Sequence, residues 1–344
     1  MFGSGDIGID LGTSSILIYV GGKGIVLREP SVIAMAAESK DVKAVGAEAY
    51  RMLGRTPGNI VAVRPMKDGV IADYSLTERM LTLFLRKTLS PMARFFKPQV
   101  MVGVPSGVTD VERRAVVQAL VEAGARRAFL IEEPLAAAVG SGIDIAQPIG
   151  TMVVDIGGGS TDIAVLSLGG IVVSESLRTA GNAFDEAVVR YVRKNFNLLI
   201  GERTAEEIKI KIGAAKPVGE EESMSAEIRG RDLVTGLPRT VEINTNHVVE
   251  ALSEPIGQVV LAVRRILESS PPELVSDIVT RGILLTGGGG LFRHLDQVIE
   301  EATGVPVMIS ENALEAVAIG TGRALEMIPV LKDTLVSSDR VMRR

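Results

Sequence analysis

Short apolar runs alternate along this chain with longer segments in which apolar residues recur at helical spacing. The runs predict strands at residues 7–9, 16–20, 100–104, 129–131, 152–154, 163–166, 171–174 and 283–285, the last of them buried. A helix is expected over residues 111–123, opened by Thr109 and Glu112 as a capping box, and a second one from Pro134, which three alanines soon follow. Strands followed by helices over 344 residues favour a layered α/β fold of about two domains.

An internal repeat gives this pattern more detail. Residues 9–12, Ile-Asp-Leu-Gly, precede a hydroxyl-rich segment and an apolar strand, and residues 154–157, Val-Asp-Ile-Gly, do the same 145 positions later. Each copy reads as strand, aspartate, glycine turn, hydroxyl residues and strand. We therefore expect two similar α/β domains whose equivalent turns face each other across a cleft.

The chemistry of these turns is suited to an anion. Consecutive backbone N–H groups in a glycine turn can cradle phosphate oxygens, and nearby hydroxyls add donors. The candidate phosphate-binding residues are Gly12, Thr13, Ser14, Ser15, Gly157, Gly158, Gly159, Ser160 and Thr161. Asp10 and Asp155, at the strand ends, are expected to hold Mg²⁺ through water molecules. The alternative is that the Asp and Gly residues merely end hairpins, which is less plausible for two copies than for one.

Three further segments carry candidate chemistry. Glu132 and Glu133 lie where a strand feeds a helix, so one of them could orient an attacking water, or both could simply favour a helix N-terminus. The glycines that follow the strand at 283–285 can lie flat against a ligand such as a purine ring: Gly287, Gly288, Gly289 and Gly290. Glu206 and Lys209 share a helix face, where the ordinary expectation is a solvated ion pair between them.

The segment 90–98 fits an ordinary loop poorly. Met92, Phe95 and Phe96 lie between two prolines and beside basic residues, although the chain has only 8 phenylalanines. An apolar tip with basic neighbours is suited to a membrane interface. Burial of the tip against a neighbouring domain is the alternative.

Composition excludes several classes of function. The 37 basic residues are outnumbered by 42 acidic ones, which argues against a nucleic-acid partner. The chain has no cysteine and 2 histidines, which excludes thiol catalysis and a multi-histidine zinc site. The first residues show no basic and apolar export signal, so a cytoplasmic location is expected.

The two phosphate turns, the connecting glutamate and the late glycine loop resemble the hallmarks of the actin-like ATPase superfamily. Within it the chain is similar to the MreB family of bacterial actin homologues, including Mbl. The likeness covers about residues 5–330 and includes the segments at 22–26, 29–32, 64–73, 103–105, 130–134, 201–206, 235–239 and 271–278. One departure is Ser160, where family members often have threonine.

The resemblance implies four subdomains around an ATP cleft. Their expected boundaries are 1–29, 75–144 and 320–344 for subdomain IA, 30–74 for IB, 145–180 and 251–319 for IIA, and 181–250 for IIB. It implies that Glu133 positions the attacking water, with Asp10, Asp155 and Ser160 as further catalytic candidates, and that Glu206 and Lys209 contact the adenosine. The expected activity is a slow, Mg²⁺-dependent ATPase coupled to polymerisation.

The resemblance also implies partners and a place in the cell. The expected assembly is an antiparallel double protofilament on the inner face of the cell membrane, where it organises cell-wall elongation and rod shape. Met92, Phe95 and Phe96 would then be the membrane-inserting residues, and membrane proteins of the elongation machinery would be partners. The alternative is a monomeric actin-fold ATPase, such as a chaperone nucleotide-binding domain, which would need a further substrate domain, or a small-molecule kinase.

Overall fold

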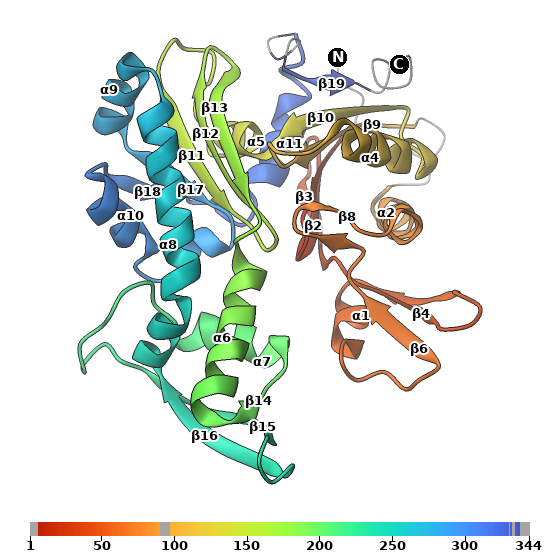
Figure 1. The fold of residues 1–344 in the computed structure, drawn as a ribbon. Helices are drawn as coiled ribbons and strands as arrows, with labels where there is room; N and C mark the ends of the chain where they lie inside the picture. Colours follow the sequence, from red (N-terminus) through yellow and green to blue (C-terminus); the bar gives the residue numbers. More distant parts are fainter. Residues whose placement is uncertain (1–5, 90–96, 330, 332–333, 338–344) are drawn as a thin grey trace.

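Two mixed β-sheets form the frame of the molecule. The computed structural model describes residues 6–89, 97–329, 331 and 334–337 (Figure 1). The first sheet contains, in spatial order, β19 (Val336–Ser337), β10 (Arg127–Glu132), β9 (Gln99–Val104), β1 (Ile7–Leu11), β2 (Ser15–Val20) and β3 (Gly24–Pro30). The second contains β13 (Gly170–Leu177), β12 (Thr161–Ser167), β11 (Thr151–Ile156), β17 (Ile283–Thr286) and β18 (Val307–Ile309).

The two sheets repeat one topology, which confirms the duplication predicted from the sequence. In the first sheet β1, β2 and β3 form an antiparallel meander, while β1 pairs in parallel with β9, and β9 with β10. In the second sheet β11, β12 and β13 form the meander, while β11 pairs in parallel with β17, and β17 with β18. The eight predicted strands are all present. The apolar side chains of β13 are only partly buried or exposed, because it is an edge strand of its sheet.

Two short helices lie between the sheets, as Figure 1 shows for α5 (Glu133–Gly140) and α11 (Ala316–Ala324). All residues of α5 are buried, and its alanines share a core with side chains of both sheets. A Cβ at Gly140 would overlap the carbonyl oxygen of Ala316, and one at Gly320 would overlap that of Ala136. Small residues therefore let the two helices cross at close range. Helix α5 starts at Glu133, one residue before the predicted start at Pro134.

Longer helices cover the outer faces of both sheets. The first sheet carries α2 (Tyr74–Thr88) and α4 (Asp110–Glu122), and the predicted capping box of Thr109 and Glu112 is present at the start of α4. The second half contains α8 (Thr245–Ser269), α9 (Pro272–Arg281), the short 3₁₀ helix η1 (Gly289–Leu291) and α10 (Leu295–Thr303). Within the described ranges, no helix has the length and apolar character needed to cross a bilayer.

Each half also carries an inserted unit with its own small sheet. In the first half, β4 (Ile33–Ala36), β5 (Val42–Val45) and β6 (Ile60–Val63) pack against α1 (Ala47–Met52), followed by the hairpin of β7 (Met66–Lys67) and β8 (Val70–Ile71). In the second, β14 (Leu198–Leu199), β15 (Ser225–Asp232) and β16 (Pro238–Asn244) lie beside α6 (Gly181–Phe196) and α7 (Glu202–Ile212).

The two inserted units differ in one part of their cores. Beside α1 lies a small separate cluster of Val32, Ala34, Ala44 and Ala49, although Ile33 of the same unit belongs to the core of the first sheet. The unit containing α6 and α7 shares one continuous core with the second sheet. Helix α8 runs across the predicted boundary at residue 250, and the four subdomain boundaries stay a prediction.

Candidate functional site

The site is built on the two hairpin turns predicted from the repeat. Residues 12–14 join β1 to β2, and residues 157–160 join β11 to β12. The backbone N–H of Gly157 donates to the carbonyl oxygen of Ser160 at 2.9 Å, which closes the second turn. The turns follow β1 and β11, which are equivalent strands of the two sheets. Each half therefore presents the backbone N–H groups of its turn at the carboxyl end of the equivalent strand.

The turns meet face to face, as the repeat predicts. A Cβ at Gly158 would overlap Ser14 Oγ and lie 2.7 Å from Ser14 Cβ, and a Cβ at Gly159 would lie 2.7 Å from Thr13 Cβ. The Thr13 hydroxyl also accepts a hydrogen bond from the backbone N–H of Gly69 at 2.9 Å. Glycine is therefore required on one side of the contact so that the hydroxyl residues on the other side can fit.

A cavity of about 500 Å³ lies between the halves, around these turns. It brings together nearly all of the predicted catalytic and nucleotide-binding residues: Asp10, Gly12, Thr13, Ser14, Ser15, Glu133, Asp155, Gly157, Gly158, Gly159, Ser160, Glu206, Lys209, Gly287, Gly288 and Gly289. Gly290 is not part of the cavity wall, because it is buried behind the loop against Leu285. Thr161 is not part of it either, because it is fully buried and its hydroxyl donates to the carbonyl oxygen of Thr179 at 2.7 Å. Met92, Phe95 and Phe96 lie outside the described residues.

The floor of the cavity is acidic. Burial raises the pKa of Asp10 to about 7. The pKa of Asp155 is raised well above its usual range by burial and by the charges of Asp10 and Asp162. Burial, together with the three neighbouring aspartates, likewise raises the pKa of Glu133. These carboxylates resist ionisation because they lie close together without a positively charged partner. A divalent cation would supply that partner.

The donor arrangement indicates how such a cation would be held. Among the described residues, no group of three or more acidic or histidine side chains is placed to coordinate a metal directly. Asp10 and Asp155 stand at equivalent positions on the central strands β1 and β11, one from each half. The residues that would hold a divalent cation are therefore these two carboxylates, and coordination through water stays a prediction.

The sequence analysis did not select Asp162 as a site residue, although the repeat contains it. It is fully buried on β12 directly opposite Asp155, and it accepts a hydrogen bond from the backbone N–H of Ser106 in the other half at 2.9 Å. Burial raises the pKa of Asp162 to about 6, although the bond from Ser106 opposes this rise. The available signal was an aspartate within the second copy of the repeat, directly before the apolar run at 163–166.

The predicted ion pair between Glu206 and Lys209 is not formed, so that alternative was wrong. Lys209 Nζ pairs with Asp185 at 2.7 Å and donates to the carbonyl oxygen of Gly181 at 3.0 Å. Glu206 accepts a hydrogen bond from the hydroxyl of Tyr50 instead. Burial raises the pKa of Asp185 to about 6, and the ammonium group of Lys209 limits that rise. Lys209 and Glu206 therefore bind partners on other helices, Asp185 on α6 and Tyr50 on α1, and not each other.

The start of α6 is a further part of the site that sequence reasoning missed. The backbone N–H groups of Gly181 and Asn182 donate to the carbonyl oxygens of Gly157 and Gly158 at 3.1 and 2.8 Å. Ser14 Oγ donates to Asn182 Oδ1 at 3.3 Å. The first turn of α6 therefore supports the second glycine turn and contacts the first one.

The glycine loop after β17 lies flat against the end of β11. Gly287 has a φ of +79°, and a Cβ there would lie 2.5 Å from Asp155 Oδ1. A Cβ at Gly289 would lie 3.0 Å from Ile156 Cβ. The loop can therefore form a thin cavity wall only if these positions are glycine.

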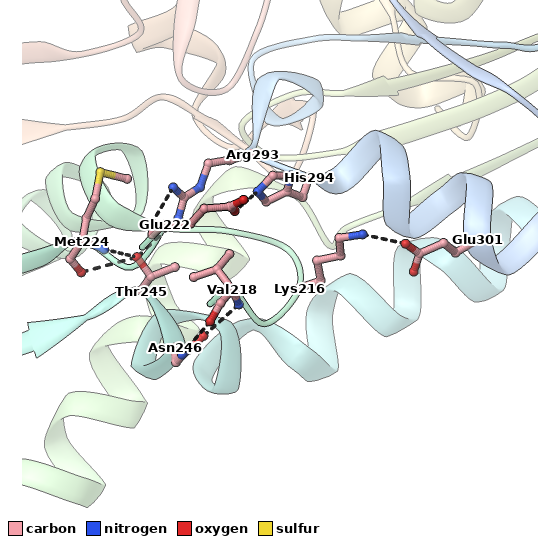
Figure 2. A network of polar contacts seen from close by, with 9 residues as sticks. All are labelled: Lys216, Val218, Glu222, Met224, Thr245, Asn246, Arg293, His294 and Glu301. Carbon is pink, nitrogen blue, oxygen red and sulfur yellow. Dashed lines mark hydrogen bonds and ion pairs between the residues drawn. The ribbon is translucent and has the colours of Figure 1, made fainter. Parts of the chain in front are cut away.

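The segment 213–224 closes the same end of the cavity and is tied down along its length (Figure 2). Arg293 donates to the carbonyl oxygen of Glu222 and to the hydroxyl of Thr245, both at 3.3 Å. Lys216 pairs with Glu301 of α10 at 2.6 Å, and the backbone N–H of Met224 donates to Thr245 Oγ at 3.0 Å. Because Met224 and Arg293 line the cavity, this network holds part of its wall in place.

The duplicated sheets, the helices between them and the facing turns define an actin-like protein. The crystal structure of MreB5 of Spiroplasma citri bound to ADP has a TM-score of 0.88 and 38% identity to this chain, and the match covers 94% of this chain and 96% of that one. The same protein bound to AMPPNP matches over the same shares of both chains, at 38% identity with a TM-score of 0.87. These neighbours confirm the predicted fold class.

Residues 4–333 match the sequence profile of the family described as "MreB/Mbl protein". The cell shape-determining protein MreB of Escherichia coli strain K12 is 53% identical over 340 residues, which is 98% of this chain and 97% of that protein. The chain therefore belongs to the MreB/Mbl family, and the resemblance inferred from its motifs is confirmed.

Proposed function

We propose that this chain is an ATP-binding protein of the cell-shape cytoskeleton that forms filaments and slowly hydrolyses Mg²⁺-ATP. The observation that carries the proposal is the meeting of two glycine turns above a floor of buried carboxylates, in one cavity. Backbone N–H groups on both sides suit a polyphosphate, and the acidic floor suits its cation. The ADP and AMPPNP named for the structural neighbour support the same ligand class.

In this proposal the two halves hold the triphosphate from both sides. The N–H groups of the turns at 12–14 and 157–160 bind phosphate oxygens, and the hydroxyls of Thr13, Ser14 and Ser160 add donors. Asp10 and Asp155 hold Mg²⁺ through water. When bound, the cation neutralises charge on the phosphates and on these two carboxylates.

Glu133 is proposed to orient the attacking water. It is the first residue of α5, directly after β10, and its side chain lines the cavity while Glu132 does not. This difference supports Glu133 over its neighbour, which residue spacing alone could not decide. Loading the cavity with a cation would favour ionised Glu133, the form that can accept a proton from water.

The nucleoside is proposed to lie between α7 and the glycine loop. Glu206 and Lys209 face this part of the cavity, with Gly287, Gly288 and Gly289 along the opposite wall. Because Asp185 and Gly181 engage the ammonium group of Lys209, this side chain is held in place before the ligand arrives.

Family membership supports the remaining parts of the proposal. The chain would assemble into antiparallel double protofilaments on the inner face of the cell membrane, with Met92, Phe95 and Phe96 inserted into anionic lipid. There it would organise cell-wall elongation with membrane proteins of that machinery. The subdomain boundaries given above are proposed with it. A monomeric actin-fold ATPase is the alternative.

Electron microscopy on an anionic lipid monolayer, with and without Mg²⁺-ATP, tests the assembly. Paired filaments that lie on the lipid are expected, and Phe95→Ala combined with Phe96→Ala should remove them from the lipid without preventing assembly in solution. Monomers that hydrolyse ATP and never assemble would support the alternative.

Phosphate release tests the chemistry. Glu133→Gln should lower the hydrolysis rate by about a hundredfold while ATP binding is retained, because the carboxylate acts on the water and not on the nucleotide. Glu132→Gln is the matched control and should hydrolyse ATP like the unaltered chain. Loss of ATP binding in Glu133→Gln would indicate a structural role instead.

A further inference from the structure

A second, outer cleft of about 950 Å³ continues from the nucleotide cavity toward the inserted units. One of its walls comes from α1 and the segment 62–68, and the other from α6 and α7. Figure 1 shows α1 and α7 on opposite sides of the gap between the halves. Four residues line both the cavity and the cleft: Thr13, Asn182, Asp185 and Glu206. A contact to one of these four can therefore affect a ligand in the cavity.

One such contact crosses the outer cleft. The hydroxyl of Tyr50, on α1, donates a hydrogen bond to Glu206 Oε2, on α7, at 2.8 Å. The guanidinium carbons of Arg64 and Arg203 lie 5.8 and 5.9 Å from the centre of the Tyr50 ring. Arg64 belongs to the first half and Arg203 to the second, so the ring is held by cation–π contacts from both halves.

The Tyr50 hydroxyl stays protonated at neutral pH and can donate to Glu206. Burial and the neighbouring Glu206 carboxylate raise the pKa of Tyr50 to about 12, so its hydroxyl keeps the proton that it donates. The bond joins a neutral donor to a carboxylate in a partly buried place, and hydrogen bonds to charged groups are among the stronger ones in proteins.

We propose that Tyr50 is the positioning residue for Glu206, and that the hydrogen bond between them couples closure of the outer cleft to retention of the nucleotide. The inference rests on the proposed function, because it takes Glu206 as a contact to the nucleoside. Opening the cleft separates α1 from α7 and breaks the bond, which frees Glu206 to turn away from the cavity. By linkage, a nucleotide that holds Glu206 in place favours the closed cleft to the same degree.

The matched control is a second tyrosine with the same chemistry. Tyr74 donates to Glu122 Oε2 at 2.9 Å, but this pair joins α2 to α4 within the first half and lies away from both cavities. Tyr50→Phe and Tyr74→Phe therefore each remove one hydroxyl and one tyrosine–carboxylate bond. They differ in whether that bond spans the two halves.

The first experiment measures release of a fluorescent ATP analogue by stopped flow. Tyr50→Phe should release it about tenfold faster, as expected for the loss of a hydrogen bond to a charged group, with a melting temperature like that of the unaltered chain. Tyr74→Phe should release it at the original rate. In a Glu206→Ala background, Tyr50→Phe should have no further effect on release, since the partner is already gone.

The second experiment measures the opening of the cleft. The chain has no cysteine, so Glu48→Cys on α1 and Glu207→Cys on α7, both exposed, can carry a pair of spin labels. Without nucleotide, Tyr50→Phe should shift the distribution of label distances toward longer values, and Tyr74→Phe should leave it unchanged. This readout does not depend on nucleotide binding.

The outcomes separate the two proposals. If Tyr50→Phe and Tyr74→Phe release the analogue at the same rate, or if Tyr50→Phe and Glu206→Ala act additively, Tyr50 does not position Glu206. If the unaltered chain does not bind the ATP analogue at all, the proposed function fails, while the label distances still report whether the pair holds the cleft closed.

Discussion

The two hairpin turns follow equivalent strands of a duplicated sheet, yet they contribute opposite features to the site. The first turn carries hydroxyl side chains, Thr13 and Ser14, directly after one glycine. The second has three glycines in succession, and its first hydroxyl comes only at Ser160. The side chains of the first turn occupy the space that β-carbons of the second would need. Duplication thus supplied two similar backbones, and close approach required their side chains to diverge.

The same contrast applies to the acidic strand ends. The pKa of Asp10 is raised to about 7 by burial, and that of Asp155 is raised well above its usual range by burial and by the charges of Asp10 and of Asp162, a further neighbour. Asp155 has this added neighbour because β12 places Asp162 opposite it, while Leu17 stands opposite Asp10 on β2. The two halves are equivalent in topology and unequal in electrostatics.

The strongest way to break the complementarity of the turns is to add one methyl group. Gly158→Ala would force a Cβ into Ser14, and we expect ATP affinity to fall about a hundredfold, the upper range for overpacking a close contact. Ser14→Gly removes the obstructing side chain, so the double variant should recover much of the loss. Isothermal titration with Mg²⁺-ATP measures both. Normal affinity in Gly158→Ala alone would contradict the steric account.

The pH dependence of stability tests the electrostatics of the buried aspartates in the two halves. The folded pKa values of about 7 for Asp10 and about 6 for Asp162 lie above the value of roughly 3.9 for an unfolded aspartate, so the stability that these two groups contribute is complete below the unfolded value and is lost as the pH rises through the folded values. The melting temperature of the nucleotide-free chain should fall by about 5 °C between pH 5 and 8.

Two variants assign this pH dependence to the site. Asp155→Asn should flatten the profile more than Asp10→Asn, because Asp155 has the additional acidic neighbour. Glu268→Gln, which changes an exposed carboxylate of α8, should leave the profile as it was. Equal flattening by all three would mean that the pH dependence arises from net charge and not from the site.

The equivalent glycines of the two turns provide a weaker comparison. A Cβ at Gly12 would lie 2.8 Å from the carbonyl oxygen of Ser15, whereas one at Gly157 would lie 3.3 Å from that of Ser160. Gly12→Ala should weaken ATP binding about tenfold and Gly157→Ala about threefold, since the backbone must move further in the first turn. Fluorescence titration with an ATP analogue compares them. The reverse order would show that the turns relax differently once nucleotide is bound.

Ser160→Thr is expected to have the smallest effect. A β-branched residue restricts the rotation of the hydroxyl, which would make the second turn resemble the first at Thr13. The hydrolysis rate should rise by about twofold, with ATP affinity unchanged. Ser160 Oγ would lie 3.0 Å from a Cβ at Gly69, so space is limited nearby. A large loss of binding would show that the extra methyl has no room, and steady-state phosphate release distinguishes the two results.

The sequence by itself determined eight strands of the two main sheets, the duplication, the capping box of α4 and about half of the residues of the cavity wall. These features depend on local order: an apolar run forms a strand wherever it is buried, and a glycine turn next to hydroxyl residues has the same donors in any surroundings. Membership of the MreB/Mbl family also followed from motifs, because they are continuous segments of the chain.

The tertiary structure alone decided which side chains meet. Glu206 and Lys209 are three residues apart on α7, and local spacing predicted that they would pair. Packing of α7 against α6, and its approach to α1, gave Lys209 to Asp185 and Glu206 to Tyr50. Such partners lie far apart in the chain, and their contact depends on how the two halves and their inserted units pack together, for which no periodicity or short motif in the sequence provides a signal.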